Sequence, residues 1–162
     1  MYQNPSRKTN NTMSKPKIEI IYREAEEKDL PPILEIMNDA ILNTTSIYDY
    51  NPRNDEFVKD WFKRKQSAKM PILVGEADNH TVGYGTYGIF RAWDAYKFSV
   101  EHSIYVHKDY QGHGIGKQLM TNLIQRAERD GYHTMIAGID ALNTKSCQFH
   151  KQFGFLEVGR LK

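Results

Sequence analysis

A glycine-rich turn between an apolar strand and an amphipathic helix constrains this chain more than any other feature. Gly112, Gly114 and Gly116 lie within five residues, in the segment Gln111–Lys117. Glycine loses much conformational entropy on folding, so three of them at a strand-to-helix junction indicate a tight turn or a close approach to a ligand. The first N–H groups of the following helix have no acceptor within it and lie at the positive end of its dipole. We therefore expect an anion cradle here, most naturally for phosphate.

Two common phosphate loops do not fit this segment. The P-loop pattern, Gly-x4-Gly-Lys-Ser/Thr, fails because Gln111 and Gln118 occupy two of its defining positions when it is aligned on Gly116 and Lys117. The dinucleotide pattern G-x-G-x-x-G fails as well, because its last position falls on Lys117 or Leu119. A plain glycine turn without a ligand and a different phosphate-bearing ligand both remain open at this point.

Apolar periodicity predicts a mixed α/β domain with alternating strands and helices. Asp29 is expected to cap the first helix and Asn54 to lie near the start of the second, while Gly131 ends the third. A turn is expected at Asp78-Asn79. Strands are expected at 18–23, 72–77, 82–90, 98–106, 134–139 and 155–160, and helices at 29–43, from 54 onward, 114–129 and 144–152.

Composition excludes several classes of protein. Residues 1–16 are polar and are expected to be a disordered leader, which leaves 17–162 as a single domain. The first seventeen residues carry four cations and no acid, so the rest holds 18 basic and 20 acidic residues and is a poor nucleic-acid binder. No apolar run approaches the ~20 residues of a membrane span. A single cysteine, Cys147, excludes a disulfide framework and a thiolate zinc site, and we expect it to be a core residue. No metal is expected.

Side chains alternate along the predicted strand at 98–106. Glu101, Ser103 and Tyr105 share one face, and His102 lies on the other among aliphatic residues. A carboxylate in such a strand is costly to bury unless it is paired or used. An exposed edge, an ion pair and a functional acid all remain open for Glu101.

The predicted helix at 144–152 carries a second group of polar residues. At helical spacing Asn143, Ser146 and His150 fall on one face, while Phe149 and Phe153 fall on another. A polar face of this kind can meet a ligand while the aromatic face packs. A lone histidine on a short helix is nevertheless more often structural than catalytic.

The glycine turn resembles the acetyl-CoA loop of the GNAT superfamily of N-acetyltransferases. Gln111, Gly114 and Gly116 fill its pattern Gln/Arg-x-x-Gly-x-Gly/Ala, and the resemblance covers about residues 18–162. It implies a mixed, mostly antiparallel central sheet flanked by helices, with a splayed strand pair that holds acetyl-CoA. In such a fold the strand backbone binds the pantetheine arm and the loop backbone binds the pyrophosphate. The cofactor-binding residues that the resemblance implies are Ile104, Tyr105, Val106, Gly112, His113, Gly114, Ile115, Gly116, Lys117, Asn143 and Ser146.

Three longer segments are similar to one branch of that superfamily, the phosphinothricin and L-methionine sulfoximine N-acetyltransferases. They are 38–48, 83–91 and 99–106. The similarity implies a small acceptor with a free α-amino group and a carboxylate, for which Arg91 offers a bidentate fork. A solvated loop cation is the other interpretation of Arg91. The acceptor-binding residues expected from the similarity are Arg91, Trp93, Glu101, His102 and Ser103.

The resemblance also implies a mechanism, with Glu101 and His150 as the catalytic residues. Glu101, through a water molecule, takes the proton of the acceptor ammonium group, and an N–H of the strand at 104–106 stabilises the oxyanion. His150 stands where many members carry a tyrosine, and it is expected to protonate the departing thiolate. Protein or peptide N-acetylation, or an inactive CoA-binding module, are the alternatives. A cytoplasmic homodimer that binds neither nucleic acid nor membranes is expected. Relatives continue beyond Lys162 with a further strand, so the C-terminal strand is expected to be missing.

Overall fold

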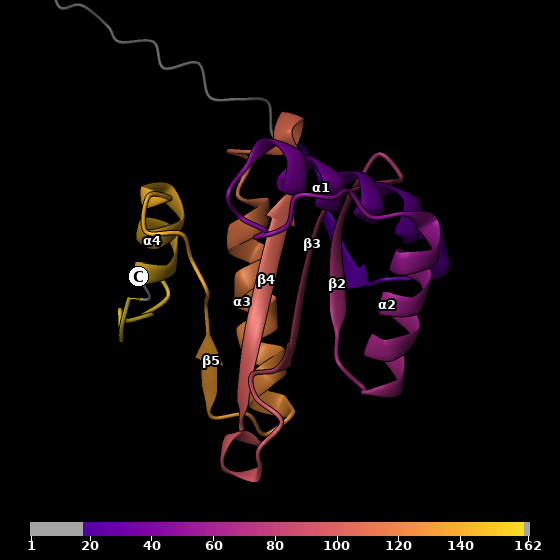
Figure 1. Ribbon diagram of the computed structural model, residues 1–162. Helices are drawn as coiled ribbons and strands as arrows, with labels where there is room; N and C mark the ends of the chain where they lie inside the picture. The colour runs from indigo at the N-terminus through magenta and orange to yellow at the C-terminus, as the bar shows by residue number, and fades with distance from the viewer. Residues whose placement is uncertain (1–17, 161–162) are drawn as a thin grey trace, which may run out of the picture.

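A computed structural model describes residues 18–160, so the leader expected at 1–16 lies outside the described residues. The polypeptide forms a five-stranded sheet with helices on both faces (Figure 1). Short 3₁₀ turns cover Glu27–Asp29, Asp94–Tyr96 and Lys108–Tyr110. The strands are β1 (Ile21–Glu24), β2 (Ile72–Ala77), β3 (His80–Ile89), β4 (Ser99–Val106) and β5 (Thr134–Ile136), and the helices are α1 (Leu30–Asn43), α2 (Asp55–Ser67), α3 (Ile115–Arg129) and α4 (Thr144–Lys151).

The strand order is β1-β2-β3-β4-β5, and the first four strands form an antiparallel meander. β5 runs parallel to β4 and pairs with it only from Ser99↔Thr134 to Glu101↔Ile136. β4 then continues to Val106 along β3, without β5 beside it. The two strands therefore separate directly after Glu101. This arrangement confirms the expected mixed sheet with a splayed strand pair.

Apolar side chains fill both faces of the sheet. On one face α1 and α2 pack on β2 and β3 through Ile33, Val58 and Phe62. On the other face α3 packs on β3 and β4, and Figure 1 shows it behind those strands. Close approach of α3 depends on Gly85, because a Cβ atom there would lie 2.9 Å from Cδ1 of Leu123. Both helical layers thus hold β3 and β4 rigidly from opposite sides.

Asp29 immediately precedes α1, but the expectation that its side chain caps this helix is wrong. No cap bond to α1 forms. The buried carboxylate instead accepts hydrogen bonds from the Arg23 guanidinium, from the Thr81 hydroxyl at 2.6 Å and from the Glu26 amide at 2.7 Å. Burial alone would raise the pKa of Asp29, but these bonds outweigh it and lower the pKa. A guanidinium fork beside the carboxylate is a stronger partner than a helix amide.

Most of the predicted elements are confirmed, among them the helix capped by Asn54, which accepts a hydrogen bond from the amide of Phe57. Asp78 and Asn79 form the expected hairpin turn, with φ of 48° and 62°. The strand expected at 134–139 is shorter, and that at 155–160 does not form. A strand needs the backbone of a neighbour, and no segment of 18–160 pairs with 155–160.

Candidate active site

The glycine turn leads directly into α3. Gly112 and Gly114 have φ of 84° and 80°, the left-handed conformation that favours glycine, and Gly114 occupies the N-cap position of α3. Ile115 is buried and anchors the first turn in the core. The N–H groups of this turn have no acceptor within the helix, so they remain available to an anion. The structure thus provides the backbone geometry that a phosphate cradle requires.

Three elements meet beside this turn: the end of β4, the start of α3 and α4. A Cβ atom on Gly116 would lie 3.7 Å from Cγ2 of Val106 and 3.9 Å from the ring of Phe149. The backbone of 104–106 pairs with β3 on one side, while β5 has ended on the other. Beyond the end of β5, the edge of β4 can therefore bind an extended ligand in the way that a sheet edge pairs with an added strand.

His102 of β4 and His150 of α4 form a buried pair that joins these two elements. Their Nε2 atoms lie 3.2 Å apart, and the rings stack with centroids 5.1 Å apart. Nδ1–H of His150 donates to the carbonyl of Ser146 at 2.7 Å, so its Nε2 accepts from Nε2–H of His102 when both rings are neutral. Nδ1 of His102 is buried and has no partner in the described residues. Burial lowers the pKa of His150, and burial with the nearby His150 lowers the pKa of His102 to about 4.

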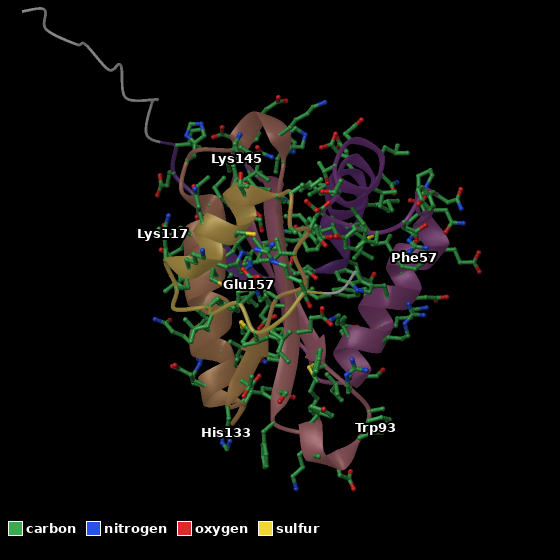
Figure 2. The ribbon with its side chains drawn as sticks, turned by 60° about the vertical axis from the view of Figure 1, so that its left-hand side comes forward. Phe57, Trp93, Lys117, His133, Lys145 and Glu157 are labelled. Carbon is green, nitrogen blue, oxygen red and sulfur yellow. The ribbon has the colours of Figure 1, made fainter. Side chains whose placement is uncertain are left out.

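Asn143 and Ser146 hold the start of α4. Oδ1 of Asn143 accepts from the amide of Ser146 at 3.0 Å and caps the helix. In Figure 2 Lys117 of α3 and Lys145 of α4 lie on the same side of the molecule. Cys147 is half-buried on this helix. The polar residues expected here are thus brought together at one end of α4.

Glu101 lies at the fork between β4 and β5. It is exposed, and a Cβ atom on Gly138 would lie 3.1 Å from its Oε1. The carboxylate therefore faces the segment that follows β5. Its side chain shares the α1/α2 face of the sheet with Ser103 and Tyr105. This position is adjacent to the open edge of β4, two residues before Ser103 on the same face.

A cavity of about 190 Å³ lies between α1, α2 and the strands β3 and β4, with Ser103 and Tyr105 in its wall. Burial raises the pKa of Tyr105. Arg53, which the sequence did not single out, also lines the cavity, and its guanidinium lies 4.4 Å from the centroid of Phe57. Arg53 follows a polar loop without periodicity, so no sequence signal marked it. The alternation of side chains along β4 did predict that Ser103 and Tyr105 lie on the same face of the strand.

Arg91 and Trp93 lie in the exposed segment between β3 and β4. The guanidinium of Arg91 lies 5.0 Å from the centroid of its neighbour Phe90, and Trp93 is 72% exposed. Figure 2 shows Trp93 at the lower end of the molecule, away from Lys117. Neither residue lines the cavity beside Ser103. Of the residues expected to bind the acceptor, Ser103 alone is among those that line this cavity.

Residues 18–160 hold neither a metal-ligand cluster nor a membrane-spanning helix. No group of three or more His, Cys, Asp or Glu side chains is placed to hold a metal ion in this part of the chain. None of the helices described is long and apolar enough to cross a membrane.

Comparisons with known proteins agree with this geometry. Residues 34–155 match the model of the acetyltransferase (GNAT) family. The L-methionine sulfoximine/L-methionine sulfone acetyltransferase of Salmonella typhimurium is 37% identical over 139 residues, which are 86% of this chain and 81% of that protein. An acetyltransferase of Salmonella typhimurium solved with acetyl-CoA is 34% identical, with a TM-score of 0.82 over 88% of each chain.

A third relative carries a different activity in its name. The ribosomal-protein-alanine N-acetyltransferase of Brucella melitensis superposes with a TM-score of 0.84 at 38% identity and covers 86% of each chain. The family match alone spans well over half of the sequence. This chain therefore belongs to the acetyltransferase (GNAT) family.

Proposed function

We propose that this enzyme transfers the acetyl group of acetyl-CoA to the α-amino group of a small amino-acid-like acceptor, of the methionine sulfone, methionine sulfoximine or phosphinothricin type. One observation carries the proposal: Glu101 stands where β4 and β5 separate, on the strand that leads into the glycine turn. The name of the Salmonella typhimurium relative supports the acceptor class. The resemblance of segments 38–48, 83–91 and 99–106 supports the same class.

Acetyl-CoA is a substrate of this reaction, and the chain offers a backbone site for it. The N–H groups of 112–117 would hold the pyrophosphate, with the side chains of His113 and Lys117 beside it. The free edge at 104–106 would bind the pantetheine arm. Asn143 and Ser146, at the start of α4, would contact the same arm from the other side.

Glu101 would act as the general base, through a water molecule, and remove a proton from the acceptor ammonium group. The freed amine attacks the thioester carbonyl, and an N–H of the strand at 104–106 stabilises the oxyanion. The C–N bond forms, the C–S bond breaks, and coenzyme A leaves as a thiolate, while the second proton of the attacking nitrogen passes to solvent water. His150 would protonate that thiolate. In the described state Nδ1–H of His150 is bonded to Ser146 and its Nε2 carries no proton. This role therefore requires the pair with His102 to open and Nε2 of His150 to take up a proton from solvent.

Acceptor binding is proposed for Arg91, Trp93, Ser103 and His102 as the resemblance implies. Ser103 lines the cavity on the Glu101 face and has the clearest structural support. His102 lies on the opposite face, against α4, so its support is weaker. We also propose a cytoplasmic homodimer that binds no nucleic acid and no metal. The excess of acidic residues outside the first seventeen supports the absence of a nucleic-acid partner.

A second candidate is acetylation of a protein or peptide amine, which the Brucella melitensis relative and the exposure of Arg91 favour. A thiol-release assay with acetyl-CoA separates the two candidates. Its acceptors are methionine sulfone, methionine sulfoximine, phosphinothricin and a peptide with an N-terminal alanine. We expect release with the amino acids and not with the peptide. Release with the peptide alone, or with none of the four, would contradict the proposal.

A further inference from the structure

A lysine lies on the inner face of α2. Val58 and Phe62 are buried on that face, and Lys65 follows Val58 by seven residues, which brings it to the same side of the helix. Its Nζ donates a hydrogen bond to the main-chain carbonyl of Tyr87 in β3, at 2.7 Å. Burial lowers the pKa of Lys65 to about 8. The apolar period of α2 therefore ends on a partly buried amine rather than on an aliphatic side chain.

This amine has no acidic partner. Lys65 forms no ion pair with any carboxylate of the described part of the chain, 18–160. An ammonium group carries three N–H donors, and the carbonyl of Tyr87 takes one of them. Desolvating a cation without a counter-charge is costly. An anionic ligand would supply the missing charge.

A cavity of about 230 Å³ opens beside this amine. Trp61, Met70 and Gly88 line it, together with Lys65 and Arg64. Trp61 also lines the cavity that contains Ser103, so the two cavities are neighbours on one face of the sheet.

Gly88 connects this cavity with the expected general base. In the β3–β4 ladder Gly88 lies directly opposite Glu101. A Cβ atom on Gly88 would lie 3.2 Å from Nζ of Lys65, so the open side of Gly88 faces the lysine. Residues directly opposite in an antiparallel pair present their side chains on the same face, with Cα atoms about 4.5–5.5 Å apart. Lys65 and Glu101 therefore project on one face, at one level of the sheet, a single strand apart.

We propose that Lys65 binds the α-carboxylate of the acceptor in the cavity beside Trp61 and Gly88, with the α-amino group toward Glu101. In an α-amino acid one carbon separates the two charged groups, so a cation one strand away from the base suits such an acceptor. The inference rests on the proposed function and makes it more specific. Arg64 is exposed, whereas Nζ of Lys65 lies against Gly88, which lines the cavity.

The test compares two acceptors on three variants in the thiol-release assay. The acceptors are methionine sulfone and its α-carboxamide, which lacks the carboxylate charge. Lys65→Met keeps the aliphatic stem, Lys65→Arg keeps the charge, and Lys63→Met removes an exposed charge two residues earlier on α2. For Lys65→Met we expect KM for methionine sulfone to rise about 10- to 100-fold, as for a lost charge-assisted bond. KM for acetyl-CoA and kcat/KM for the carboxamide should change less than about threefold.

Lys65→Arg should keep the preference of the wild type for the acid over the carboxamide, and Lys63→Met should match the wild type. An equal loss of kcat/KM on both acceptors in Lys65→Met would overturn the inference. It would indicate that the hydrogen bond from Lys65 to the carbonyl of Tyr87 has only a structural role. If Lys65→Met does not fold, the wild type still tests the inference. A wild-type preference for methionine sulfone over its carboxamide of less than about threefold would also overturn it. Wild-type enzyme that acetylates neither acceptor, but does acetylate the peptide, refutes the proposed function itself and this inference with it.

Discussion

His102 and His150 lie stacked between β4 and α4, with their Nε2 atoms 3.2 Å apart in a bond that needs an unprotonated Nε2 on His150. Burial lowers the pKa of both residues, to about 4 for His102. The unfolded chain binds protons at its histidines near pH 6.5. The folded protein binds fewer protons between these pKa values, so acid favours the unfolded state.

Acidification should therefore destabilise the protein through this pair. The contribution of His102 is fully present above pH 6.5 and is lost as the pH falls toward 4. At pH 5 it amounts to about 2 kcal/mol relative to pH 8. Urea unfolding at both pH values measures this loss. In His102→Leu the difference in unfolding free energy between pH 5 and pH 8 should shrink by about that amount. In His133→Gln, at an exposed histidine, that difference should match the wild type. An unchanged difference in His102→Leu would contradict the neutral pair.

Coenzyme A binding should depend on the left-handed residue at the start of α3. Gly114 has φ of 80°, and Gly131, just after α3, has φ of 82°; a Cβ atom on either would meet nothing within 4 Å. Alanine at either position should cost about 1–2 kcal/mol of stability. Gly114→Ala should also weaken coenzyme A binding about tenfold, because its backbone forms the cradle, while Gly131→Ala should not. Calorimetric titration of both variants checks this, and equal affinities would argue against the cradle.

The buried carboxylate of Asp29 should be a main determinant of stability. Asp29→Ala leaves the Thr81 hydroxyl and the Glu26 amide without their acceptor, while Arg23 keeps Glu76, and should cost about 1–3 kcal/mol in the free energy of unfolding. Asp60→Ala, at an exposed position of α2, should cost less than about 0.5 kcal/mol. Denaturant titration at pH 7 measures both. A loss under about 1 kcal/mol in Asp29→Ala would show that the hydrogen bonds of Asp29 contribute little to the free energy of unfolding.

The sequence predicts those parts of this fold that local patterns determine. The apolar period predicted the inner face of α1 and that of α3. The glycine turn predicted the junction of β4 with α3. The sequence could not predict which partners Asp29 would choose, because one of them, the Thr81 hydroxyl, comes from β3, 52 positions along the chain. The strand expected at 155–160 failed for the same reason, since a strand depends on a neighbour elsewhere in the chain.

The same distinction holds for the site. Alternation along β4 was enough to place Glu101 with Ser103, and helical spacing was enough to place His150 with Ser146. The contact of His150 with His102 spans 48 positions and follows from tertiary packing. Lys65 was overlooked although it continues the inner face of α2 by one turn, because a lysine at such a position is usually exposed at its charged end.

The central claim is that Glu101, at the fork of β4 and β5, removes the proton of a bound amino-acid amine. Steady-state thiol release with acetyl-CoA and methionine sulfone tests it most directly, in the wild type, in Glu101→Gln and in the control Glu56→Gln at an exposed site of α2. We predict that Glu101→Gln lowers kcat/KM for methionine sulfone at least about 100-fold, leaves KM for acetyl-CoA unchanged and removes the acidic limb of the pH profile. Turnover by Glu101→Gln at the wild-type rate, with the wild-type pH profile, would contradict the account.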